Sequence, residues 1–295
     1  MTDAINVFNR DSVRRHRERA ASDFAAHDFL HREVAERLLD RLDDVTRRFP
    51  LAADIGCRGG LLGSLLAGRG GIETIVGGDM APALAAGHDG PALVMDEEAL
   101  PFADGSLDLV LSNLGFHWIN DLPGALVQIR RALKPDGLLL ASMFGGETLK
   151  ELRHCLGDAE LEIENGLSPR VSPFADIRDI GSLMQRAGFA LPVLDAEIIT
   201  VSYADPLNLM RDLRGMGESN AVNERRRSFS RRTTIMRAME LYLERYRDPD
   251  GRVHATFDVI FITAWAPAEN QQKPARRGSA DVSLADVLTK PANGD

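Results

Sequence analysis

The sequence predicts an α/β protein whose core is a doubly wound, mostly parallel seven-stranded sheet, with helical insertions in the C-terminal half. Three observations lead to this fold class. Short apolar runs of strand length alternate with helical patterns between residues 51 and 144. The first run ends in a glycine turn, and a helix follows at once. After residue 144 the alternation loosens and longer helical segments separate the last strands. Strands that alternate with helices pair in parallel, because each helix returns the chain to the same edge.

The organising stretch is Leu51–Gly60, LAADIGCRGG, in which a buried strand runs into a glycine turn. A dinucleotide fingerprint counted from Gly56 requires glycine at positions 58 and 61, where the chain has Arg58 and Leu61. An acid two residues before the first glycine, as Asp54 stands here, is instead typical of the D-x-G-x-G-x-G motif of S-adenosylmethionine sites. The motif resembles that of class I methyltransferase-fold proteins. This resemblance implies a Rossmann-like sheet, S-adenosylmethionine as cofactor, and cofactor contacts from Asp54, Gly56, Cys57, Gly59 and Gly60.

One residue departs from this motif, because Arg58 takes the place of its central glycine. If position 58 needs a positive φ, arginine costs about 1–2 kcal/mol there. Alternatively the turn shifts by one residue and Gly59 takes that conformation, which is the arrangement that we expect. We also expect Arg58 to point to solvent and Cys57 to fill space in the loop.

Composition limits the classes of protein that fit. The 295 residues are 44% hydrophobic, enough for one large core or two modest ones. No apolar run is long enough to span a bilayer and no signal-peptide pattern occurs, so we expect a soluble, cytoplasmic protein. The net charge of −9 argues against nucleic acid as the main partner. Arginines cluster in 10–19 and 225–232, either as solvated helix faces or as a patch for an acidic partner or peripheral membrane contact.

The elements, taken in order, predict four segments. They are an N-terminal helical cap (1–50), a cofactor-binding core (51–145), a C-terminal half with substrate-side helices and the last strands (146–267), and a polar tail (268–295). Within the cap, apolar residues of 30–49 recur every three or four positions and stop at Pro50, which predicts an amphipathic helix.

The second strand, 73–79, ends at Asp79, about 20 residues after the glycine loop, where a carboxylate can accept both ribose hydroxyls of a nucleoside. The alternative is that Asp79 caps the next helix. By the family resemblance, Met80 covers the adenine face. The third strand and its exit are 91–102, and there the resemblance implies that Asp96 or Glu97 holds the adenine amino group.

The fourth strand lies within 106–118, at the centre of the sheet, with Ser112 and Asn113 at its carboxyl end facing the cofactor crevice. Asp121 caps a helix that stops at a turn, 134–137, before the fifth strand, 138–144. The later elements are a helix at 145–156, a polar insertion at 158–174, a helix at 176–188, a strand at 196–203, helices at 205–214 and 231–247, and an antiparallel last strand at 255–265. The apolar stretch 282–288 in the tail docks or stays free.

Five segments outside the glycine loop resemble one family: LGFHWINDLPGAL, MFGGETLKELR, SPRVSPF, GMGESN and RGSADVSL. They resemble the bacterial relatives of a mitochondrial respiratory complex I assembly factor, a methyltransferase-fold family associated with hydroxylation of an arginine in a complex I subunit. The match covers nearly the whole chain and implies a protein substrate from complex I. A looser resemblance, to the malonyl-carrier-protein methyltransferases of biotin synthesis, implies a small acyl substrate.

Two residues are candidates for the catalytic role. His117 is the only histidine that we expect at the carboxyl end of the sheet, either as a general base or as a structural residue beside Trp118. Glu218, in the loop 215–220, either pairs with an arginine guanidinium of the substrate or belongs to a helix end followed by an N-cap serine. The other histidines form no recognisable ligand set with a carboxylate, so we predict no metal.

Three hypotheses of function therefore stand. The first is an S-adenosylmethionine-dependent enzyme that hydroxylates or methylates a side chain of a complex I subunit. The second is an O-methyltransferase for a carrier-bound or small carboxylic acid. The third is a cofactor-binding assembly chaperone without turnover, for which Arg58 in the glycine loop is the main support.

Overall fold

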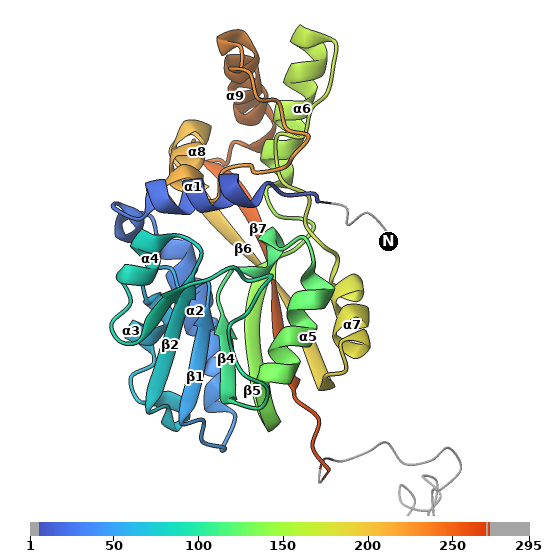
Figure 1. The fold of residues 1–295 in the computed structure, drawn as a ribbon. Helices are drawn as coiled ribbons and strands as arrows, with labels where there is room; N and C mark the ends of the chain where they lie inside the picture. The colour runs from blue at the N-terminus through green and yellow to red at the C-terminus, as the bar shows by residue number, and fades with distance from the viewer. Residues whose placement is uncertain (1–5, 270, 272–295) are drawn as a thin grey trace, which may run out of the picture.

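The computed structural model describes residues 6–269 and residue 271, and it confirms the predicted fold class (Figure 1). Seven strands form one sheet in the order β3-β2-β1-β4-β5-β7-β6. The pairs from β3 to β5 are parallel, whereas β7 runs antiparallel between β5 and β6, as expected of the last strand. The strands are β1 (Leu51–Ile55), β2 (Thr74–Asp79), β3 (Ala92–Val94), β4 (Leu107–Ser112), β5 (Leu133–Phe144), β6 (Ala190–Tyr203) and β7 (Val253–Trp265).

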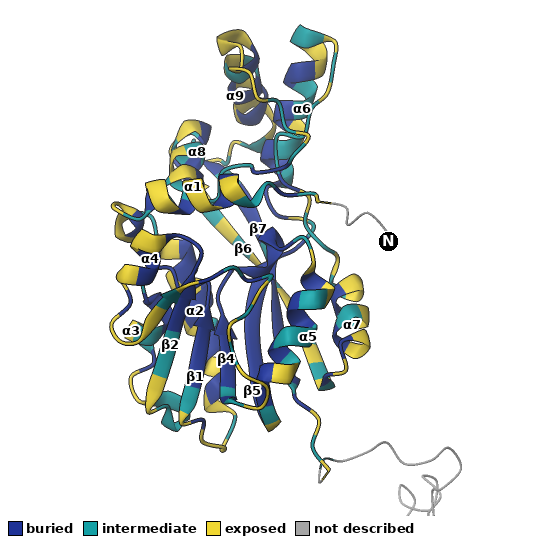
Figure 2. Cartoon of the chain, in the orientation of Figure 1, coloured by how far each residue is buried: buried dark blue, intermediate teal, exposed yellow. Residues whose placement is uncertain are grey.

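Helices cover both faces of the sheet. α2 (Phe29–Asp43) buries Val34 and Leu38 in one core, together with Leu109 and Leu111 of β4. α5 (Leu122–Ala132) and α7 (Ile177–Arg186) build a second core with Val110, the β4 residue that points to the opposite face. Both faces of the central strands are therefore buried, which explains their nearly continuous apolar sequences (Figure 2).

The remaining helices frame the carboxyl edge of the parallel strands (Figure 1). α3 (Leu61–Leu65) and α4 (Pro82–Ala86) follow β1 and β2, and α1 (Arg10–Ala20) lies across the same edge. Above it stand α8 (Pro206–Gly215) and a pair of packed helices, α6 (Lys150–Glu164) and α9 (Arg232–Tyr246). A short 3-10 turn, η3 (Phe116–Trp118), follows β4. The cap and the C-terminal insertions thus meet over one edge of the sheet.

Some boundaries differ from the expectation. α2 ends before 49, and Phe49 reaches the core from a turn in which its N–H donates to the Gly70 carbonyl at 2.8 Å. The polar insertion at 158–174 is wrong in its first part, because α6 continues to Glu164. Its polar residue Glu160 does not break the helix, since glutamate is a good helix former, and its side chain pairs with Arg170 at 2.7 Å.

Two further expectations concern the C-terminal tail and a membrane-spanning helix. The apolar stretch 282–288 lies outside the described residues. Among the helices that the structure describes, none combines the length and the apolar composition that crossing a bilayer requires.

Candidate active site

The glycine loop between β1 and α3 is held against β2. The N–H groups of Gly56 and Cys57 both donate to the Gly78 carbonyl, at 2.8 and 3.0 Å. Gly56 has a φ of 76°, Arg58 of 46° and Gly59 of 75°. The expectation of a shifted turn is therefore wrong: Arg58 itself takes the left-handed conformation, and Gly59 takes it as well. Consecutive left-handed residues turn the chain tightly enough to enter α3 at once.

The side chain of Arg58 does not point to solvent, which corrects the second expectation for this residue. Only 3% of Arg58 is exposed. Its Nη2 lies 2.5 Å from Oε1 of Glu218, and its Nη1 donates to the Met216 carbonyl at 2.9 Å. Glu218 is thus paired with a guanidinium of the protein's own glycine loop, and the expected pairing with an arginine of the substrate stays a prediction.

Glu218 joins three further side chains at the centre of the site. Its Oε2 accepts hydrogen bonds from His117 Nε2 at 3.0 Å and from Trp118 Nε1 at 2.8 Å. His31 Nε2 lies 3.9 Å from Oε1, so His117 is not the only histidine at this edge of the sheet. Burial alone would raise the pKa of Glu218, but Arg58 and His117 hold it well below its usual range. Glu218 is an ionised carboxylate at the centre of this cluster.

Burial keeps both histidines neutral at physiological pH. It lowers the pKa of His117 despite the neighbouring Glu218, and burial followed by the Arg58 charge lowers the pKa of His31 to about 3. The hydrogen bond to Glu218 places the His117 proton on Nε2. The other ring nitrogen, Nδ1, is buried without a partner among the described residues. Glu218 thus orients the ring, and the choice between a general base and a structural residue stays a prediction.

A second charged cluster lies where the cofactor's nucleoside was expected, and α1 contributes to it. Arg17 is fully buried, with Nη1 at 2.5 Å from Glu97 Oε1 and 3.5 Å from Asp79 Oδ1. Arg10 bonds Glu97 and lies 2.6 Å from Asp96. Burial would raise the pKa of Glu97, but Arg17 and Arg10 lower it to about 2. The structure brings Asp79, Asp96 and Glu97 together, and the arginines of the cap neutralise them.

Asp79 is not at an exposed strand tip, since none of it is accessible to solvent. Its Oδ1 accepts from the Ala81 N–H at 2.9 Å, and its Oδ2 accepts from the Arg58 N–H at 3.3 Å. The carboxylate therefore fastens the glycine loop to the end of β2. The N-cap of α4 is Ala81, so Asp79 is not its N-cap. Its role toward a ribose stays a prediction.

The remaining expected cofactor residues are all buried: Ser112, Asn113, Met80 and Cys57. Ser112 Oγ donates to the Ile55 carbonyl at 2.8 Å, and the side chain of Asn113 bonds His31 and Ser142, so both tie strand ends together and neither faces an open crevice. Met80 is buried beside Trp118. Cys57 is buried, as a space-filling residue should be.

Asp54 differs from all of these, because its carboxyl group is buried without a hydrogen bond or an ion pair from the described residues to replace its lost hydration. Only 1% of Asp54 is exposed, and neither carboxylate oxygen has a hydrogen-bond partner in the described part of the chain. Burial, and then the Asp79 charge, raise its pKa to about 8. Without a ligand, Asp54 is therefore a protonated carboxyl group at neutral pH, and a positively charged ligand group beside it would favour its ionised form.

These residues fit S-adenosylmethionine. The unpartnered Asp54 suits the α-ammonium group of its amino-acid end, and the glycine turn admits close backbone approach. Asp79 and Glu97 are acceptors for hydroxyl and amino groups once Arg17 withdraws. The described residues contain no group of three or more histidine, cysteine or acidic side chains arranged to hold a metal. The fold and this site define the class of S-adenosylmethionine-dependent, methyltransferase-type enzymes.

Comparisons with known proteins agree. Residues 53–141 match the family described as "Methyltransferase domain". The chain is 44% identical to the arginine-hydroxylase NDUFAF5, mitochondrial, of Danio rerio, over 96% of this chain and 90% of the relative. It is 37% identical to the malonyl-[acyl-carrier protein] O-methyltransferase of Methylovorus sp., over 90% and 92%. The structure of the YcgJ protein from Bacillus subtilis has the same fold, with a TM-score of 0.55 at 13% identity over 79% of this chain and 99% of that one. The chain belongs to the class I S-adenosylmethionine-dependent methyltransferase family, which includes the NDUFAF5 arginine hydroxylases.

Sequence reasoning missed Arg17, Arg10 and His31. The first two belong to the arginine-rich stretch 10–19. Its positive charge, next to the acidic residues of the expected nucleoside site, was the signal that could have indicated them. For His31 the sequence held no signal, because its neighbours in the site come from three distant segments.

Proposed function

We propose that this enzyme modifies an arginine side chain of a respiratory complex I subunit, by hydroxylation or methylation, as a step in complex I assembly. The observation that carries the proposal is the 44% identity, over nearly the whole chain, to a relative named arginine hydroxylase. The location is expected to be the cytoplasm, with peripheral membrane contact during the reaction. Residues 1–50 serve as the cap, 51–145 as the cofactor core, 146–267 as the substrate side and 268–295 as a polar tail.

The roles of the chain's own residues follow from their contacts. Asp54, the glycine turn, Asp79 and Glu97 would hold the cofactor, which would supply an electrophilic methyl group for methylation. Hydroxylation would instead insert one oxygen atom of dioxygen and would need two electrons from a cellular reductant. His117, oriented by Glu218, accepts a proton from the substrate at Nδ1. Arg58 keeps Glu218 ionised, because the guanidinium offsets the cost of a buried charge. The support of Arg58 for a chaperone without turnover falls away, since this residue belongs to the site.

The second candidate is O-methylation of a carrier-bound or small carboxylic acid. Relatives named malonyl-[acyl-carrier protein] O-methyltransferase support it, at 37% identity over 90% of the chain or more. A carboxylate substrate needs a cationic partner. Arg170 is the one basic side chain that lines the cavity beside Glu218, among the described residues, and Glu160 already neutralises it. The same holds for an arginine substrate, because Arg58 neutralises Glu218. The O-methylation candidate ranks second because its relatives are less similar to the chain, at 37% against 44% identity.

Mass spectrometry of complex I subunits, from cells with and without this protein, tests the proposal. The expected result is one arginine that carries an added oxygen or an added methyl group only when the protein is present. Cells that produce the His117→Ala variant serve as the matched control and lack the modification. If the subunits stay unmodified in both kinds of cell, and cells without the protein lack the methyl ester of carrier-bound malonate, the second candidate is established instead.

A further inference from the structure

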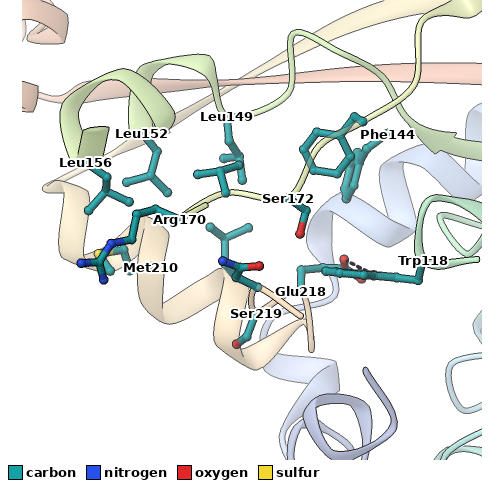
Figure 3. A pocket seen from close by; sticks show the side chains of 14 residues that line it. Trp118, Phe144, Leu149, Leu152, Leu156, Arg170, Ser172, Met210, Glu218 and Ser219 are labelled. Carbon is teal, nitrogen blue, oxygen red and sulfur yellow. Dashed lines mark hydrogen bonds between the residues drawn. The ribbon is translucent and has the colours of Figure 1, made fainter. Parts of the chain in front are cut away.

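We propose that the cavity beside Glu218 is the site that selects the substrate, and that it takes an uncharged, apolar group next to the modified atom. The inference rests on the proposed function for the identity of the substrate, but the site itself is argued from its lining. The cavity has a volume of about 230 Å³ and lies between η3, α6, α8 and the loop that carries Arg170 (Figure 3).

Most of the cavity wall is apolar. Aromatic and aliphatic side chains make up the larger part of it: Trp118, Phe144, Phe174, Leu149, Leu152, Leu156, Val171, Met210 and Leu213. Ser172, Ser219 and Asn220 add uncharged polar groups, and Arg170 and Glu218 are the charged lining residues. Figure 3 shows Leu152 and Leu156 projecting from α6 into this space, with Trp118 beside Glu218 at its other end. Such walls favour a group that loses contact with water when it enters.

The two charged groups at the cavity are already compensated by the protein. Glu218 accepts from Arg58 at one oxygen and from His117 and Trp118 at the other. Arg170 donates to Glu160 and to Ser230, each at 2.7 Å. An incoming cation or anion therefore finds no uncompensated opposite charge, yet it still loses its hydration. The lining selects against charge of either sign.

Size and position define the ligand further. An apolar cavity of about 150 Å³ is enough to bind benzene. The larger cavity here holds an aliphatic chain of several carbons or an aromatic ring with a substituent. One end of it is Glu218, whose partner Arg58 belongs to the glycine loop. The apolar group thus lies beside the cofactor loop, as a hydrophobic neighbour of the modified residue does.

Three probes of equal chain length test this inference in the intact protein: uncharged 1-pentanol, the cation pentylammonium and the anion pentanoate. The chain has two tryptophans, so the two indole N–H signals in an NMR titration report two places. Trp118 lines the cavity, whereas Trp265 ends β7, far from it. We expect 1-pentanol to shift the Trp118 signal and not the Trp265 signal, with an affinity about tenfold or more above that of either ion.

Variants on α6 supply the matched control. Leu152→Phe fills the cavity and is expected to abolish the Trp118 shift, whereas Leu161→Phe, at a site 51% exposed on the same helix, leaves it unchanged. Stronger binding of pentylammonium or pentanoate, or no shift of Trp118 with 1-pentanol in the parent protein, overturns the inference. The titration needs no turnover. If the probes behave as expected while complex I subunits stay unmodified, the cavity is established and the proposed function fails.

Discussion

Arg58 affects the free energy of unfolding in two opposite ways, and each can be measured separately. Its φ of 46° costs about 1–2 kcal/mol relative to glycine. Its guanidinium, however, is the close partner of the buried Glu218 carboxylate, and loss of one partner from a buried ion pair costs about 3–5 kcal/mol. The contact explains why the chain keeps an arginine where a glycine would be less strained.

Arg58→Gly is therefore expected to destabilise the folded protein by about 2 kcal/mol, the difference between these two effects. Unfolding in denaturant gives the free energy. Ala67→Gly is the control, because Ala67 has a φ of 45° and an exposed side chain, so this change isolates the backbone contribution. A glycine variant at position 58 that is more stable than the parent contradicts the role assigned to the ion pair.

Asp54 makes stability depend on pH in a predictable direction. Its pKa rises from about 4 in the unfolded chain to about 8 in the folded one. Between these values the folded state holds a proton that the unfolded state has lost, so stability without cofactor falls as pH rises, by up to about 1.4 kcal/mol per pH unit. Denaturant unfolding at several pH values measures the slope. Asp54→Asn, which cannot ionise, is expected to flatten it, and an unchanged slope shows that another group is responsible.

At the scale of elements, α1 is a cap that both covers the site and occupies it. The segment before it is tied to the opposite wall: the Phe8 ring packs edge-on against Trp118 at 5.4 Å, and the Asn9 N–H donates to the Ala221 carbonyl at 2.8 Å. From this position α1 inserts Arg17 between Asp79 and Glu97. Arg17 thus occupies hydrogen-bonding positions of both carboxylates that a ribose or an amino group would use, so it competes with the cofactor for them.

Arg17→Gln is expected to weaken the folded protein without cofactor by about 3–5 kcal/mol, because two buried carboxylates lose their partner. S-adenosylmethionine is expected to bind this variant more tightly, since nothing needs to be displaced. Isothermal calorimetry, together with unfolding experiments, measures both effects. Arg14→Gln is the control on the same helix, where the side chain is half exposed. Weaker binding by the Arg17 variant identifies Arg17 as a cofactor ligand instead of a competitor.

At the scale of the whole molecule, the sheet, the cap and the C-terminal helices close around one edge, and a ligand that binds there stabilises all three. The glycine spacing excludes a dinucleotide fingerprint, and the site fits S-adenosylmethionine. Binding to the folded state alone raises the free energy of unfolding according to ligand concentration.

S-adenosylmethionine and its demethylated product are therefore expected to stabilise the protein by about 2.7 kcal/mol at 100 times the dissociation constant, and NAD not at all. Thermal unfolding in the presence of each ligand measures the shift in Tm. Asp79→Ala is expected to lose the shift and also to lower stability without ligand, because Asp79 holds the glycine loop and Arg17. A shift with NAD instead contradicts the cofactor assignment.

The sequence by itself determined the features that depend on local pattern. Apolar runs and helical spacing predicted the order of strands and helices, and an acid before a glycine turn predicted the loop and its cofactor, since backbone conformation and periodicity act over a few residues.

Only the tertiary structure decided which charges meet. Arg58 finds Glu218 across 160 residues, and Arg17 finds Glu97 across 80. In the sequence each of these arginines is typical of a solvated surface. Burial makes the difference, because a charge removed from water must find a partner, and the fold alone brings that partner within reach. Asp54, which the fold buries without such a partner, keeps its proton in the folded state instead, because burial raises its pKa to about 8.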